Sequence, residues 1–280
     1  MMGDSMKKQL TLVLKGMLIG LGKVIPGVSG SLIAVSLGVY EQAMEAIGHF
    51  LKHTKENILF LGTLSIGILV SIVFGSQMVV YLLEFFYVPT MLLFIGFIAG
   101  AVPSLSKKIH DKNKTFLFYF CIAFLFLFLL QFFSSSSHFV PEKNINSYLV
   151  IIGIGFLDAA TMVIPGVSGT AIFMILGCYA FVLNLFANIS TFYLVLSNFP
   201  YYFFFGVGLL LGVLLVSRMM SYLFLKHNQM TYSLIMGFTI SSILLLLQKV
   251  FLYGVTFLEL SIGIVLACIG YFTSLKFGSD

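Results

Sequence analysis

Two short segments of the sequence carry the residue types needed to bind an anion at an interrupted helix. Residues 24–31 read Val-Ile-Pro-Gly-Val-Ser-Gly-Ser, and residues 163–170 read Val-Ile-Pro-Gly-Val-Ser-Gly-Thr. Proline lacks a backbone N–H and clashes with the preceding turn, so each Pro-Gly ends one half-helix and the following Ser-Gly begins another. Ser29 and Ser168 are suitable N-caps, and glycine lets a ligand approach a helix N-terminus, whose free N–H groups and dipole favour an anion.

Charged residues inside apolar segments are the next candidates, since each costs about 2.5–3.5 kcal/mol to place in a bilayer and usually marks a pathway. Lys23 precedes Pro26 by three residues and can neutralise a phosphate directly. The guanidinium fork of Arg218 suits bidentate phosphate contact, although an arginine there can equally snorkel to the headgroups. Asp158, seven residues before Pro165, can pair with a cation or titrate as a coupling site.

Tyrosines follow the two segments at equal spacing. Tyr40 and Tyr179 either donate hydrogen bonds into the site or belong to an interfacial aromatic belt. The breaks themselves can be packing kinks, but two long and nearly identical copies favour a functional role. The predicted substrate-binding residues are Lys23, Pro26, Gly27, Ser29, Gly30, Ser31, Tyr40, Pro165, Gly166, Ser168, Gly169, Thr170, Tyr179 and Arg218, with Asp158 as a possible coupling residue.

The composition indicates that these segments lie in a membrane protein. Of 280 residues 60% are apolar and 9% are charged, against about 25% charged in a soluble domain, so a water-facing surface cannot be covered. The long apolar runs exceed barrel-strand length, which predicts an all-α integral membrane protein. The net charge of +5 comes from lysines between these runs, which meet lipid headgroups and not nucleic acid. No histidine or cysteine spacing predicts a metal, and we expect no cofactor.

The whole chain reads as a tandem duplication, because the similarity continues well beyond the two segments. Matched pairs include Gly38 and Gly177, Tyr40 and Tyr179, Gly67 and Gly208, Ser76 and Ser217, and Gly96 and Gly237. The seam lies within residues 134–146. It divides one transmembrane domain into repeat 1 (residues 1–138) and repeat 2 (residues 139–280).

Each repeat is predicted to contain a re-entrant helical hairpin with the Pro-Gly break, followed by three transmembrane helices. The hairpins cover residues 10–48 and 148–185, because their arms are marginal in length for a full crossing. The expected spans are 58–83, 88–102 and 116–133 in repeat 1, and 192–224, 231–247 and 251–275 in repeat 2.

Lysine placement predicts the topology. With returning hairpins one side carries Lys7, Lys8, Lys15, Lys52, Lys55, Lys107, Lys108, Lys112, Lys114, Lys226 and Lys276, and the other side carries Lys143 and Lys249. The positive-inside rule then puts both termini in the cytoplasm. Three full spans per repeat make the second repeat inverted relative to the first, an arrangement typical of transporters with discontinuous helices.

Several segments together resemble one known family. Residues 16–20 (Gly-Met-Leu-Ile-Gly), 24–30 (Val-Ile-Pro-Gly-Val-Ser-Gly) and 38–41 (Gly-Val-Tyr-Glu) resemble the polyprenyl-phosphate (undecaprenyl phosphate) transporter family of bacteria and archaea. The second Pro-Gly-Val-Ser-Gly and the Gly-Phe pairs at 96–97 and 237–238 fit the same pattern, so the resemblance covers nearly the whole chain.

This resemblance implies a flippase in the cytoplasmic membrane of a prokaryote. Such a protein returns undecaprenyl phosphate, or a related polyprenyl phosphate, to the inner leaflet and so recycles the carrier lipid of peptidoglycan and teichoic acid synthesis. It further implies that residues 26–31 and 165–170 line the headgroup site, with Arg218 as a phosphate contact. The chain departs from the family pattern at Lys23, where an acidic residue is frequent, and at residues 30–32, where Gly-Ser-Leu replaces Gly-Gly-Thr.

Two other functions remain open from the sequence. An integral membrane undecaprenyl-pyrophosphate phosphatase uses similar repeats, but it needs a nucleophile with clustered carboxylates and an arginine, and here Gly30 and Gly169 follow the two serines. A transporter or channel for a small soluble anion can use the same half-helix ends. No P-loop motif is present, so a proton or sodium gradient, or the lipid gradient itself, must supply the energy. The oligomeric state stays open.

Overall fold

The computed structural model describes residues 2–24, 29–50, 52–71, 74, 76–109, 111–130, 132, 139–167, 169, 172–173, 176–187 and 192–278. Within these ranges the chain is helical and contains no strand, as the sequence predicts. The helices are α1 (Met2–Val24), α2 (Gly30–Ser36), α3 (Tyr40–Gly48), α4 (Thr54–Val70), α5 (Ser76–Phe85), α6 (Tyr87–Ala99), α7 (Ala101–Lys108), α8 (Lys114–Leu130), α9 (Ile145–Val163), α11 (Tyr179–Ala187), α12 (Phe192–Ser197), α13 (Phe199–Lys226), α14 (Asn228–Tyr253) and α15 (Phe257–Gly278).

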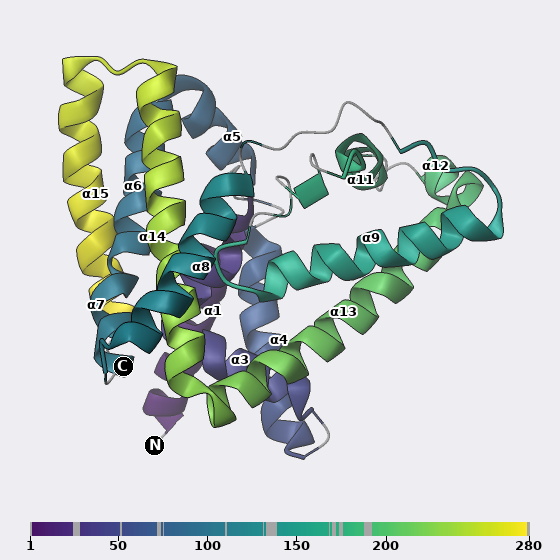
Figure 1. Cartoon of the computed structure of the whole chain (residues 1–280), viewed down its shortest axis with the longest axis horizontal. Helices are drawn as coiled ribbons and strands as arrows, with labels where there is room; N and C mark the ends of the chain where they lie inside the picture. The colour runs from purple at the N-terminus through teal and green to yellow at the C-terminus, as the bar shows by residue number, and fades with distance from the viewer. Residues whose placement is uncertain are drawn as a thin grey trace.

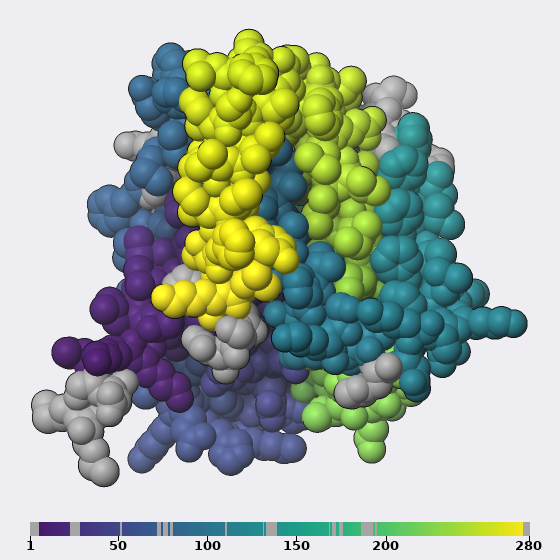
Figure 2. Space-filling model, turned by 90° about the vertical axis from the view of Figure 1, so that its left-hand side faces the viewer, coloured from purple at the N-terminus to yellow at the C-terminus, as the bar shows by residue number. Residues whose placement is uncertain are grey.

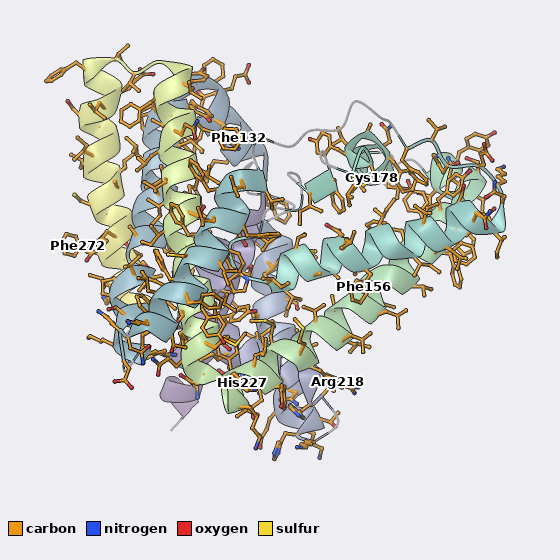
Figure 3. The ribbon with its side chains drawn as sticks, viewed as in Figure 1. Phe132, Phe156, Cys178, Arg218, His227 and Phe272 are labelled. Carbon is orange, nitrogen blue, oxygen red and sulfur yellow. The ribbon has the colours of Figure 1, made fainter. Side chains whose placement is uncertain are left out.

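Five of the described helical segments are long and apolar enough to cross a bilayer. They are Tyr87–Lys108, which joins α6 and α7, Ile145–Val163, Phe199–Lys226, Asn228–Tyr253 and Phe257–Lys276. The outward surface is apolar as well: Phe257 is 88% exposed and Phe272 is 66% exposed, and Figure 3 shows Phe272 pointing away from α15. The chain is therefore a multi-pass, all-helical membrane protein.

Three of the expected spans have different limits in the structure. The span expected over 58–83 contains two described helices, α4 and α5, and residues 72, 73 and 75 between them lie outside the described part of the chain. The span expected over 192–224 is divided into α12 and α13, because Pro200 occupies the first turn of α13 and cannot continue a preceding helix. The span expected from residue 251 begins at Phe257, since α14 continues to Tyr253 and ends at Gly254.

The two predicted hairpin regions differ in the lengths of their helices but share a glycine turn. The helix α9, which the sequence assigns to the second re-entrant hairpin, has the length and apolar character of a full span. The helices α2 and α3 are much shorter, with seven and nine residues. Gly38 and Gly177 match in the sequence and both have φ of 69°, a left-handed conformation that glycine adopts without strain, so the chain makes the same turn before Tyr40 and before Tyr179.

Two helix crossings of the same kind occur, one in each half of the chain. Gly16 of α1 lies against the backbone of Leu64 and Gly67 in α4, and the equivalent Gly155 of α9 lies against the backbone of Phe205 and Leu209 in α13. A Cβ at either glycine would overlap a carbonyl oxygen of the partner helix, so the close approach depends on glycine. Figure 1 shows α9 and α13 running side by side toward the centre of the molecule.

The remaining long helices pair across the two halves. Gly96 of α6 packs on Ala267 of α15, whereas its counterpart Gly237 of α14 packs on Phe120 and Ala123 of α8. Each half thus supplies one glycine-bearing helix to a partner from the other half. Figure 2 faces this side of the molecule and shows α15, in yellow, beside α14.

Candidate functional site

The two Pro-Gly segments meet in the interior. The backbone N–H of Gly166 donates to Ser29 Oγ at 3.3 Å, and Ser31 Oγ donates to the carbonyl oxygen of Ile164 at 3.3 Å. Ser29 and Ser31 also share a hydrogen bond of 2.7 Å between their hydroxyls. Both serines are buried, so the sequence motif of repeat 1 is bonded directly to that of repeat 2.

Local backbone geometry explains why these groups are available for such bonds. Ile164 ends α9 in an extended conformation, as expected for a residue before proline, and Gly166 then takes a positive φ of 86°. Ser29 has the extended backbone of an N-cap before α2, and its carbonyl accepts from the N–H groups of Leu32 and Ile33. Ser29 is thus the N-cap residue of α2, as the sequence predicts, but its side chain makes no capping bond. The hydroxyl is directed to the second segment instead.

Two further hydroxyls hold the second segment in place. Tyr40 OH donates to the carbonyl oxygen of Val163 at 2.6 Å, and Ser242 of α14 donates to the carbonyl oxygen of Gly166 at 3.3 Å. Ser242 was missed by sequence reasoning, although a serine pair in the middle of an apolar span was the available signal.

The equivalent tyrosine in repeat 2 has different surroundings. Tyr179 is partly buried and packs against a separate apolar cluster that contains Phe173 and Phe181. It follows the same glycine turn as Tyr40, but Tyr40 belongs to the other apolar cluster of the protein. The two tyrosines therefore do not form a symmetric pair.

Of the other predicted site residues, some lie among the described residues and some do not. Gly30 begins α2, and Pro165 is buried between Ile164 and Gly166. Gly169 lies next to the side chains of Thr161 and Asp158, so the carboxylate of Asp158 is at the second segment. Lys23 is in the last turn of α1, and nothing is described of its side chain. Pro26, Gly27, Ser168 and Thr170 lie outside the described residues.

A buried lysine stands close to the first hairpin. Lys15 of α1 is 9% exposed, and its Nζ donates to the carbonyl oxygen of Leu37 at 2.8 Å. Leu37 is the C-cap of α2, where a cation also interacts favourably with the helix dipole. The sequence marked Lys15 only as a topology signal, although a charge inside an apolar run generally indicates a functional position.

Arg218 lies at the opposite end of α3 from the joined segments. Its Nε donates to the carbonyl oxygen of Gly48, the last residue of α3, at 3.1 Å. Tyr40, which contacts the second segment, is the first residue of that nine-residue helix, so the two ends are separated by about 12 Å along its axis. Figure 3 shows Arg218 on the lower part of α13, close to α4. In the described part of the chain, Arg218 bonds to the end of α3 and to no residue of the Pro-Gly segments.

A polar cluster, Glu41–Lys108–Tyr232, fixes the outer side of α3. Glu41 Oε1 accepts from both Lys108 Nζ and Tyr232 OH, and Lys108 Nζ also lies 5.1 Å from the centroid of the Tyr232 ring. The cluster joins α3 to α7 and α14 and was not predicted. Within the described ranges no group of three or more His, Cys, Asp or Glu side chains can hold a metal ion.

The joined segments place hydrogen-bonding groups in an apolar interior. Hydroxyls and backbone N–H groups converge there. Comparison with protein families gives the decisive match: residues 19–257 fit the family described as VCA0040-like, undecaprenyl phosphate translocase-like. The chain belongs to this family. The resemblance seen in the sequence is thereby confirmed.

Two relatives of the VCA0040-like chain illustrate the match. A polyprenyl-phosphate transporter of Vibrio cholerae serotype O1 is 28% identical over 248 residues, which covers 84% of this chain and 76% of the relative. A polyprenyl-phosphate transporter of Staphylococcus aureus is also 28% identical, over 273 residues and 95% of both chains. No solved structure matches the chain significantly. Family membership supports a transporter of a lipid carrier.

Proposed function

We propose that this protein is a flippase that moves undecaprenyl phosphate, or a related polyprenyl phosphate, between the leaflets of a prokaryotic cytoplasmic membrane. The lipid would return for reuse in cell-envelope synthesis, including peptidoglycan, and the protein would act as a transporter and not as an enzyme. Family membership supports the assignment of the protein as a transporter of a lipid carrier. The observation that carries the finer assignment is the direct bonding of Ser29 and Ser31 to the second Pro-Gly segment.

In this proposal the phosphate headgroup is held between the two Pro-Gly segments. In the structure, the hydroxyls of Ser29 and Ser31 and the N–H of Gly166 form hydrogen bonds within the protein. The Ser29 and Ser31 hydroxyls bond to each other, Ser29 Oγ accepts from the N–H of Gly166, and Ser31 Oγ donates to the carbonyl oxygen of Ile164. A phosphate oxygen is a stronger acceptor than any of these partners, so it would replace them when the segments separate. The start of α2 at Gly30 adds further N–H donors, and the prenyl tail remains in lipid.

The transport cycle would move one repeat, residues 1–138, against the other, residues 139–280, with a re-entrant hairpin in each. The equivalent crossings of α1 with α4 and of α9 with α13 support two copies of one unit. Inverted orientation is supported by Figure 1, where the equivalent helices α6 and α14 run in opposite directions. Rocking of such repeats around a central site gives alternating access.

Both termini would lie in the cytoplasm, and a proton or sodium gradient would drive transport. Figure 1 places the end of α7, the start of α8, the turn between α3 and α4 and the end of α13 at one end of the molecule. These elements carry Lys108, Lys114, Lys52 and Lys226, in keeping with the positive-inside rule. Asp158, beside Gly169, is the proposed coupling residue.

The test is translocation in proteoliposomes that contain a polyprenyl phosphate and an imposed proton or sodium gradient. An external phosphatase measures the lipid phosphate that reaches the outer leaflet. We expect the double variant Ser29→Ala/Ser31→Ala to lose most of the activity, whereas Ser36→Ala, in the same helix but bonded only within it to Leu32, keeps it. Wild-type protein that moves no lipid phosphate, that releases phosphate from a pyrophosphate lipid, or that conducts inorganic phosphate instead would refute the proposal.

A further inference from the structure

A hollow of about 600 Å³ lies at the lysine-rich end of the molecule, beside the C-terminal end of α3. It is bounded by that helix, the turn after it, α4 and α13. Its polar lining includes Arg218, Lys52 and His49, and its apolar lining includes Phe50, Leu61 and Leu214. The volume lies within the range of about 300–1,000 Å³ that is typical of small-molecule sites.

The charge of this hollow is entirely positive. No acidic side chain is among the described residues that line it. Arg218 is held in place by the bond from Nε to the carbonyl oxygen of Gly48, which leaves both Nη groups, with four N–H donors, for a ligand. In the described part of the chain no carboxylate pairs with Arg218 or Lys52. A fixed guanidinium beside a lysine is suited to a phosphate group.

The walls of the hollow suit an apolar chain attached to that phosphate. Leu214 belongs to the membrane-length helix α13 and is 44% exposed, so this wall is open to the lipid side. Leu61 on α4 and Phe50 after α3 continue the apolar surface. A hydrated inorganic anion gains nothing from such walls, whereas burying each CH₂ of a lipid tail contributes about 0.8 kcal/mol.

The hollow is separate from the joined Pro-Gly segments, because the length of α3, about 12 Å, lies between Gly48 and Tyr40. We propose that it is a second binding site, for a phosphate monoester on an apolar tail, in which Arg218 and Lys52 hold the headgroup and Leu61 and Leu214 contact the tail. The identity of that lipid as the transported one rests on the proposed function. The site then holds the lipid on the lysine-rich face before or after its passage between the segments.

The test measures binding to purified protein in nanodiscs of neutral lipid, with three probes: a short-chain prenyl phosphate, the matching prenyl alcohol and inorganic phosphate. We expect Arg218→Gln and Lys52→Gln each to weaken binding of the prenyl phosphate at least tenfold. Lys55→Gln is the matched control, because Lys55 lies on the same face but does not line the hollow. The same losses are expected in the Ser29→Ala/Ser31→Ala background, since the two sites are separate.

Unchanged binding in Lys52→Gln and in folded Arg218→Gln protein would overturn this second site, as would equal affinity for the alcohol. Binding of inorganic phosphate as tight as that of the prenyl phosphate would equally overturn the lipid assignment. The proposed function is judged separately by translocation. If the wild type transports the lipid but Arg218→Gln binds the prenyl phosphate as tightly as the wild type, only the second site is rejected. If Arg218→Gln weakens binding but the wild type transports no lipid, only the flippase is rejected.

Discussion

The hydroxyl oxygen of Ser29 accepts a hydrogen bond from the backbone N–H of Gly166, 3.3 Å away and 137 positions further along the chain. Replacing Ser29 by alanine leaves that buried N–H without its partner, which costs about 1–3 kcal/mol. We expect Ser29→Ala to lower the unfolding temperature in detergent. Ser36→Ala removes a bond within α2 only, so it should lower stability less. Equal losses in the two variants would contradict a special contribution from the contact between the segments.

Tyr40→Phe separates the role of the hydroxyl from that of the ring. The variant loses the bond to the carbonyl oxygen of Val163 but keeps the edge contact with Phe224, whose ring centroid is 5.8 Å away. We expect a loss of about 1 kcal/mol in unfolding free energy and slower lipid transport. Tyr222→Phe, at an exposed position on α13, is the control and should behave like wild type. Transport at the wild-type rate by Tyr40→Phe would show that the hydroxyl is dispensable.

Glycine at the crossing of α9 and α13 is expected to be required for packing. Gly155→Leu introduces a side chain against the backbone of Phe205, and overpacking of this kind costs about 1–3 kcal/mol. Gly153→Leu is a matched control in the same helix, because a Cβ there meets nothing within 4 Å. Thermal unfolding followed by size-exclusion chromatography should show a lower midpoint for Gly155→Leu alone. If both variants unfold alike, the crossing is looser than the structure indicates.

The pair of Glu41 and Lys108 can be tested by exchanging the charges. The two side chains are 44% and 48% exposed, so their ion pair is worth at most about 1 kcal/mol. We expect Glu41→Lys and Lys108→Glu each to reduce thermal stability slightly, and the double variant to recover most of the loss. A double-mutant cycle measures this coupling. Strictly additive losses would mean that the two residues do not interact in the membrane.

Sequence reasoning succeeded where a pattern acts locally or repeats. The apolar runs predicted the helical membrane class, and the equal offset of the motifs identified Gly38 and Gly177 as equivalent, which their common φ of 69° supports. It could not predict that Tyr40 reaches the second segment while Tyr179 packs in another apolar cluster. Both follow the same local turn. Their contacts are set by the neighbouring helices, and a sequence repeat carries no information about those.

The position of Arg218 shows the same limit. Arg218 lies within an apolar run, and the partner that the described structure gives it is the end of α3. Ser29 is the N-cap residue of α2, as expected, but its hydroxyl makes no capping bond and bonds across the protein. For both Arg218 and Ser29, the residue type indicated the kind of interaction, but the partner is determined by tertiary packing.

The exchanged pairing of α6 with α15 and of α8 with α14 has a consequence for biosynthesis. Helix α6 leaves the ribosome long before α15 is synthesised, and Gly96 cannot meet Ala267 until that later helix has been inserted. Neither half can therefore complete its packing during translation on its own. A chain that stops before Phe257 would present an open glycine face to the lipid, where quality-control proteases could recognise it as unfinished.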